Sequence, residues 1–200
     1  QSGITKSLAE AYTIDQSLRF DDGDSAYLNK TFGSAGNRKT WTYSCWVKLG
    51  NIGASRNLLW TSDAWLQLLA NNTLYNEFGS GSVYQQSNAL YRDPSAWYHI
   101  VWKVDTTDST TSQLFVNGTE ISYATNNPPA SDAESNINNA SEHRIGGTSY
   151  MDGYLAEVYF IDGQALDPDS FGETDSATNQ WKPIDAVDDL TFGTNGFYQK

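Results

Sequence analysis

Three carboxylates crowd one glycine-containing corner of the chain, at Asp21, Asp22 and Asp24. Hard cations such as Ca²⁺ take about six to eight oxygen ligands from Asp, Glu and backbone carbonyls, so this corner is a candidate calcium site. The pattern does not fit an EF-hand loop, because Gly23 comes too early and no Glu closes the loop. Solvated turn carboxylates are the alternative interpretation, and the residues alone leave that choice open.

Two short stretches combine aromatic rings with amide and carboxyl groups, at residues 60–65 and 84–91. Flat rings stack on the C–H faces of a pyranose, while polar side chains fix its hydroxyls. These stretches therefore predict a sugar-binding platform of three rings, Trp65, Tyr84 and Tyr91. The predicted hydrogen-bonding companions of these rings are Asp63, Gln86 and Asn88. Packing of the same rings in the core or at a sheet edge is the alternative.

Catalysis has no comparable support in the sequence. Glycosidases need two carboxylates that flank the scissile bond, and no predicted strand carries such a pair. Glu173 and Asp175 lie close together, but in a polar stretch without strand character. His99 and His143 lack a recognisable nucleophile, and Cys45 falls on the apolar face of its strand. We therefore expect no enzyme activity, with a glycoside hydrolase as the less favoured alternative.

The composition is acidic and rich in aromatic residues. The 200 residues carry a net charge of −12, with a pI near 4.3. Nucleic acids and anionic membranes attract basic surfaces, so neither is an expected partner. No stretch reaches the roughly 18 apolar residues of a membrane span, so we expect no membrane insertion. At this length an all-β sandwich commonly forms one unit.

Alternation of apolar and polar residues predicts β-strands, most clearly in Trp41–Leu49 and Trp97–Val104. Trp46 shares its strand face with polar residues and is a further ring that we expect to be reachable by a sugar. Tyr154–Ile161 is apolar on both faces, as in a strand that is covered on both sides. Tyr123–Asn139 is low in apolar residues and contains two prolines, which predicts a long surface loop.

Several segments together resemble a known family: SLRF at Ser17–Phe20, GNRKTWTYSCWVK at Gly36–Lys48, LFVNG at Leu114–Gly118 and GYLAEVYFIDGQAL at Gly153–Leu166. They are similar to the laminin G-like, concanavalin A-like domains that phages encode in tail-fibre and other virion proteins. The resemblance implies an all-β, antiparallel β-sandwich jelly roll. We accordingly divide the chain into an N-terminal arm (1–12), the jelly-roll domain (13–166) and a C-terminal extension (167–200) packed on or leading out of that domain.

The same resemblance implies a function. It predicts a non-catalytic adhesion domain in the virion, which binds host-surface glycans, contacts other virion proteins and forms a homo-oligomer. It also implies a structural Ca²⁺ held by Asp22 or Asp24 together with Glu157, with Asp152 in reserve. A purely structural virion module, which mediates oligomerisation or decorates a capsid or fibre without binding glycans, is the alternative.

Overall fold

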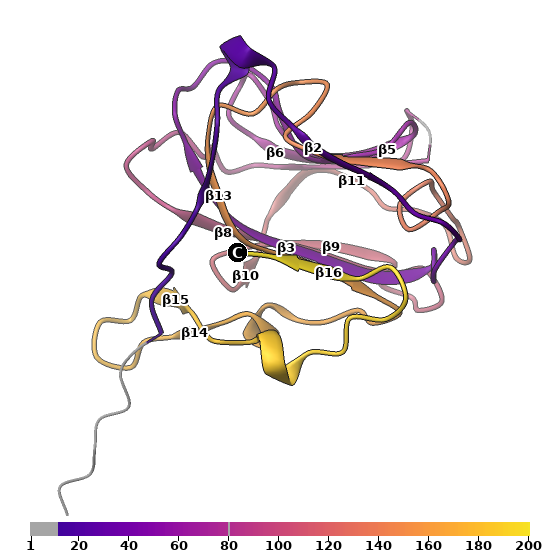
Figure 1. Cartoon of the computed structure of the whole chain (residues 1–200). Helices are drawn as coiled ribbons and strands as arrows, with labels where there is room; N and C mark the ends of the chain where they lie inside the picture. The colour runs from indigo at the N-terminus through magenta and orange to yellow at the C-terminus, as the bar shows by residue number, and fades with distance from the viewer. Residues whose placement is uncertain (1–11, 80) are drawn as a thin grey trace, which may run out of the picture.

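Two seven-stranded antiparallel sheets lie face to face in the computed structural model, which describes residues 12–79 and 81–200 (Figure 1). Residues 1–11, most of the predicted N-terminal arm, lie outside the described residues. None of the helices in the described part is long and apolar enough to cross a membrane. The predicted all-β, concanavalin A-like antiparallel sandwich is confirmed.

Sheet A has the strand order β1-β13-β3-β8-β9-β10. The seventh strand, β16, also pairs with β13, farther along that strand than β1. Its strands are β1 (Leu18–Phe20), β3 (Thr40–Leu49), β8 (Tyr98–Asp105), β9 (Ser112–Val116), β10 (Thr119–Glu120), β13 (Gly153–Asp162) and β16 (Phe197–Gln199). Neighbours in the sheet are mostly distant in the sequence, as expected for a jelly roll.

Sheet B has the order β11-β7-β6-β5-β4-β12-β2. Its strands are β2 (Leu28–Thr31), β4 (Arg56–Trp60), β5 (Ala64–Leu68), β6 (Leu74–Phe78), β7 (Tyr84–Ser87), β11 (Tyr123–Asn127) and β12 (Glu142–Ile145). A two-stranded ribbon and three short 3₁₀ turns complete the fold: β14 (Gly172–Thr174), β15 (Trp181–Pro183), η1 (Asp22–Asp24), η2 (Pro168–Ser170) and η3 (Val187–Asp189).

The main core lies between the sheets and is built from large rings. Trp41 and Trp102 are fully buried and meet edge to face, with ring centroids 4.8 Å apart. The hydroxyl of Tyr43 in sheet A donates to the carbonyl of Leu58 in sheet B at 2.9 Å and so links the layers. Cys45 lies in the same core, as predicted, and burial raises the pKa of its thiol to about 12.

A second apolar cluster covers the outer face of sheet A. Val101, Tyr159 and Ile161 point outward from the sheet and pack against Phe171 and Ala186 of the C-terminal segment. Figure 1 shows this segment, in yellow, against sheet A on the side away from sheet B. The prediction that β13 is covered on both faces is thereby confirmed, and the outer face of sheet B is left on the opposite side of the molecule.

Two loop predictions are corrected by the structure. The segment from Tyr123 was predicted to be a long loop, but its first five residues form β11 and pair with β7. The polar stretch around Glu173 and Asp175 was predicted to lack strand character, yet Gly172–Thr174 forms β14 and pairs with β15. Both errors have one cause, because these edge strands are held by backbone hydrogen bonds and carry little of the apolar pattern from which strands are predicted.

Gly153 starts β13 where no side chain fits. Its φ is 134°, and a Cβ would lie 2.1 Å from the carbonyl oxygen of Lys48. We predict that Gly153→Ala lowers the free energy of unfolding by about 3 kcal/mol or more, measured by urea denaturation. Gly33→Ala is the control, because a Cβ there meets nothing within 4 Å. Equal stability of the two variants would contradict the prediction.

Candidate functional site

A row of side chains crosses the outer face of sheet B at one level. Strand register pairs Trp60 with Trp65, Trp65 with Glu77, and Glu77 with Tyr84. We call these four residues the aromatic row. Neighbouring strands lie about 4.8 Å apart, so Trp65 and Tyr84, two strands apart, are separated by roughly 10 Å. The structure thus places the two predicted platform rings in one line, with a carboxylate between them.

Alternation along each strand points the row outward. In β5, Ala64, Leu66 and Leu68 are buried in the core, and Trp65 between them is partly exposed. The same alternation in β7 buries Gln85 and leaves Tyr84 partly exposed. The apolar pattern of the inner face therefore fixes which residues reach the outer face.

A second level of polar and aromatic side chains runs beside the aromatic row. Gln67, Tyr75 and Gln86 face one another across β5, β6 and β7. The Tyr75 ring stacks on Tyr84 with centroids 5.5 Å apart, and its hydroxyl donates to Glu77 Oε2 at 2.8 Å. Burial and the neighbouring Glu77 raise the pKa of Tyr75, so its hydroxyl stays protonated as a donor. Gln86, a predicted companion, thus lies next to the platform.

A shallow pocket of about 200 Å³ opens at the β4 end of the row. Its lining residues are Asn57, Trp60, Trp65, Gln67, Thr148 and Ser149. The Asn57 side chain is held in place, since its Nδ2 donates to the carbonyl of Gly147 at 2.8 Å and to Thr148 Oγ1 at 2.5 Å. Two indole rings with amides and hydroxyls around a small hollow are suited to a single sugar ring.

Arg144 extends the row beyond Trp60. Its guanidinium lies over the Trp60 ring at 5.0 Å from the centroid and over Tyr27 at 4.8 Å. The charge is paired with Glu142 at 2.9 Å. Arg144 therefore stiffens one end of the row through cation–π contacts, while its charge is already neutralised by a neighbour.

Other predicted site residues have structural roles. Tyr91 is only 9% exposed and packs edge to face on Tyr98, so its prediction as a platform ring is wrong. Asp63 accepts the backbone N–H of Asn136 at 2.8 Å and holds a loop. Asn88 is exposed beyond β7, away from the strand level of the aromatic row. Local sequence placed these residues near rings, but Tyr98 of β8 packs on Tyr91 and the loop at Asn136 engages Asp63.

Trp46 was expected to be reachable by a sugar, and this is also wrong. The ring is 6% exposed and lies flat on His99 with centroids 5.0 Å apart. It belongs to the outer face of sheet A, which the C-terminal segment covers, and His99 is in turn stacked on Trp181 of β15. A hollow of about 400 Å³ beside Trp46 is lined largely by residues 12–17.

His99 is a structural residue at the base of this stack. Trp181 Nε1 donates to His99 Nδ1 at 3.0 Å, and His99 Nε2 lies 2.8 Å from Ser44 Oγ. An indole N–H can only donate, so the proton of the neutral imidazole is on Nε2, which donates to Ser44. Burial lowers the pKa of His99 to about 3. His99 is therefore a packed, neutral histidine with both ring nitrogens hydrogen-bonded.

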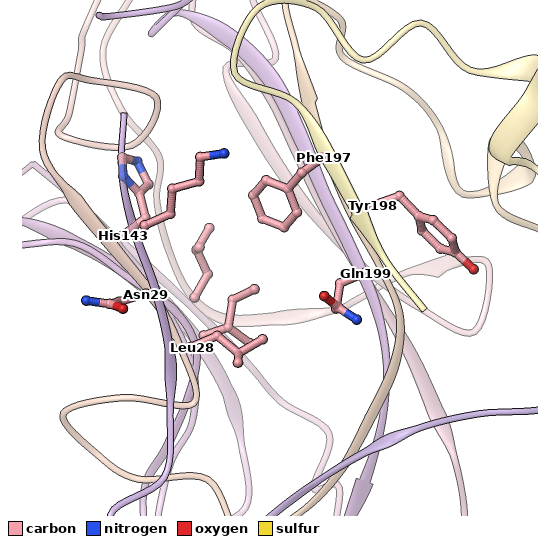
Figure 2. Close-up of a pocket in the computed structure, with 9 residues that line it drawn as sticks. Leu28, Asn29, His143, Phe197, Tyr198 and Gln199 are labelled. Atoms are coloured by element: carbon pink, nitrogen blue, oxygen red, sulfur yellow. The ribbon is translucent and has the colours of Figure 1, made fainter. Parts of the chain in front are cut away.

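His143 lines an apolar cavity of about 220 Å³ between the edges of the two sheets (Figure 2). Its Nε2 accepts the backbone N–H of Asn138, and its Nδ1 donates to the carbonyl of Ser141. Burial lowers the pKa of His143, so it too is neutral. Figure 2 shows Phe197 turned toward this cavity and Tyr198 turned away from it. With both ring nitrogens engaged, His143 has no free base to offer.

The four predicted metal ligands are not brought together. Among the described residues, no three His, Cys, Asp or Glu side chains gather in a group suited to a metal. Glu157 lies four residues along β13 from Gly153, where the strand starts. At the usual rise per residue of a strand, the two residues are about 13 Å apart. Asp22 and Asp24 belong to the exposed turn η1, which follows the end of β1 paired with Gly153.

Glu157 and Asp152 are hydrogen-bonded by different neighbours. Glu157 is 1% exposed and accepts hydrogen bonds from Tyr12, Tyr159 and Tyr198 at 2.9, 2.6 and 2.7 Å. Asp152 is hydrogen-bonded by the Asn51 amide. Burial lowers the pKa of Arg56, and the nearby charges of Asp152 and Asp22 oppose that shift. Tyrosine hydroxyls thus occupy both oxygens of Glu157, and the described structure does not gather the four predicted ligands around one point.

Sequence reasoning missed several residues of this face, namely Trp60, Gln67, Tyr75, Glu77 and Arg144. A signal for some of them was present, since Tyr75 and Glu77 are two residues apart and alternate with buried Leu74, Asn76 and Phe78. The pairing of β6 with β5 and β7 puts Glu77 between two rings. No local sequence pattern predicts this pairing.

The stacked sheets and their strand order define a concanavalin A-like sandwich. The chain belongs to the concanavalin A-like lectin/glucanases superfamily, since a laminin G model of that superfamily matches residues 21–170. None of the curated proteins matches the chain.

Two solved structures show the same fold at low identity. One is a putative carbohydrate binding protein from Bacteroides ovatus, with 15% identity and a TM-score of 0.59 over 78% of this chain and 45% of that one. The other is the heptameric SAP-like pentraxin from Limulus polyphemus, with 14% identity and a TM-score of 0.52 over 78% of this chain and 76% of that one. The chain thus spans less than half of the first of these proteins.

The buried, neutral His99 predicts how stability depends on pH. Its pKa is about 3 in the folded state and near 6.5 when unfolded, so below about pH 6.5 only the unfolded chain takes up this proton. The His99 contribution to the free energy of unfolding should therefore fall by about 1.4 kcal/mol between about pH 7.5 and pH 5.5. Urea denaturation of His99→Gln should show a pH dependence that is shallower than that of the wild-type chain by that amount. An unchanged slope in His99→Gln would disprove this assignment.

Proposed function

We propose that this chain is a non-catalytic, lectin-like adhesion domain that binds host-surface glycans on the outer face of sheet B. The observation that supports this best is the aromatic row, in which Trp65 and Tyr84 flank a carboxylate on a face turned away from the C-terminal cover. The rings offer stacking surfaces, and the amides and carboxylate offer partners for hydroxyl groups.

The geometry favours a short stretch of glycan chain over a single sugar. Trp65 and Tyr84 are roughly 10 Å apart, and the small pocket lies on the far side of Trp65 from Tyr84. A sugar ring in the pocket and a second one over Tyr84 would share Trp65 as a common wall. The row runs across the strands, so its spacing is set by backbone hydrogen bonds and needs little rearrangement on binding.

We assign the domain to a phage virion, where it would contact other virion proteins as part of a homo-oligomer. The support is the resemblance of segments such as Gly36–Lys48 and Gly153–Leu166 to phage virion domains. Mass spectrometry of purified phage particles that carry the gene would test this location. Absence of the protein from the particles would contradict it.

A purely structural module is the rival function, and the same aromatic row favours it. A partly exposed line of rings is also suited to a contact between subunits. Light scattering separates the two functions: Trp65→Ala should leave the oligomeric state unchanged if the row binds glycans, and should dissociate the assembly if the row is a subunit contact.

Removal of a row ring should weaken glycan binding. We predict that Trp65→Ala and Tyr84→Ala each lower affinity for the best ligand on a glycan array by roughly tenfold, because each removes a stacking surface worth about 1 kcal/mol or more. Tyr154→Ala is the control, because Tyr154 is an exposed ring on sheet A. Wild-type affinity in both row variants would remove the proposed site.

We also predict that the domain does not hydrolyse the glycans it binds. Hydrolysis needs a pair of carboxylates, whereas Glu77 stands alone in the row and Glu142 is paired with Arg144. Reducing-end assays on bound glycans should show no turnover above a blank, with a commercial glycanase as the positive control. Turnover that is lost in Glu77→Gln or Glu157→Gln would show that the domain is an enzyme.

A further inference from the structure

We propose that Glu77 is a specificity-determining residue, which restricts this face to glycans without acidic groups. The inference rests on the proposed function, since it concerns the same outer face of sheet B. It goes further by naming the class of ligand: neutral sugars bound through their hydroxyl groups, with sialylated, uronic and sulfated glycans excluded.

Glu77 is placed where a bound sugar must pass. Register puts it between Trp65 on β5 and Tyr84 on β7, at the centre of the aromatic row. It is 9% exposed, so the side chain is held by its neighbours. Any glycan that stacks on both rings therefore lies over this carboxylate.

One carboxylate oxygen is available to a ligand. Oε2 accepts the hydroxyl of Tyr75 at 2.8 Å, whereas Oε1 has no hydrogen-bond partner among the described residues. Neither oxygen belongs to the unpartnered atoms that are sealed from solvent in the described chain. A carboxylate can only accept hydrogen bonds, so the free oxygen selects donors, which on a glycan are hydroxyl groups.

Among residues 12–79 and 81–200, no cation forms an ion pair with Glu77. The cation next to the row, Arg144, is already paired with Glu142 and lies beyond Trp60. The rings on either side of Glu77 exclude water and strengthen charge interactions near it. A carboxylate or sulfate on a sugar over Trp65 or Tyr84 would thus meet a like charge, on a chain with a net charge of −12.

Gln67 and Gln86 complete this selection from the adjacent level. Their amides can donate and accept, and they lie on the strands on either side of Tyr75. Together with Glu77 they form a set of partners that matches hydroxyl groups, which also donate and accept. In the described part of this face, these two levels of side chains contain no free cation of the kind that binds an acidic sugar.

The test uses a glycan array that holds neutral glycans and the same glycans carrying a sialic acid, a uronic acid or a sulfate. The wild-type chain should prefer the neutral member of each pair by roughly tenfold at low salt. Glu77→Gln keeps the shape and an acceptor for Tyr75, and it should lower that preference by roughly fivefold or more. Asp188→Asn changes the net charge equally at an exposed position in η3 and should leave the preference unchanged.

The outcomes separate the two proposals. Equal or tighter wild-type binding of acidic glycans, still lost in Trp65→Ala, would overturn the role of Glu77 and leave the glycan site intact. An unchanged preference in Glu77→Gln, or an equal loss in Asp188→Asn, would also overturn it. Binding of no glycan on the array would contradict the proposed function, and this inference with it.

Discussion

The asymmetry between the two outer faces of the sandwich is the constraint on which the rest of the structure depends. Sheet A is apolar on both sides at β13, and it needs the cover that Phe171 and Ala186 provide. Sheet B alternates buried residues inside, which are apolar in β5 but include Asn76, Gln85 and Ser87 in β6 and β7, with rings and polar groups outside. Because the C-terminal segment covers the outer face of sheet A, the outer face of sheet B is the one on which a ligand can bind.

The fold was predictable because its signals are local. Strands β3 and β8 alternate strictly, and β13 is apolar on both faces, which together require a two-layer body with an extra cover. Strands such as β11 and β14 were missed, since backbone pairing with a neighbour holds them and their side chains add little. A pattern in the sequence records what a strand buries, and it does not record which strand it joins.

The candidate site was predictable only in part, for the same reason. Trp65, Tyr84 and Gln86 were predicted from local mixtures of rings with polar side chains, and alternation within their own strands does send them outward. Tyr91 and Trp46 have the same local appearance, but Tyr98 and His99 cover them after folding. The exposure of a ring depends on contacts that only folding brings about. Rings with similar local sequence therefore differ in whether they are buried or reachable from solvent.

Glu157 and Glu77 show how surroundings decide the role of one residue type. Glu157 sits at a bulge in β13 with φ of 49°, and three tyrosine hydroxyls occupy both of its oxygens. Tyr12 and Tyr198 come from opposite ends of the described chain, so this buried carboxylate ties both segments to sheet A. Glu77 has one tyrosine partner and keeps an oxygen free on sheet B. A carboxylate with hydrogen bonds to both oxygens has a structural role. A carboxylate with a free oxygen can still accept a hydrogen bond from a ligand.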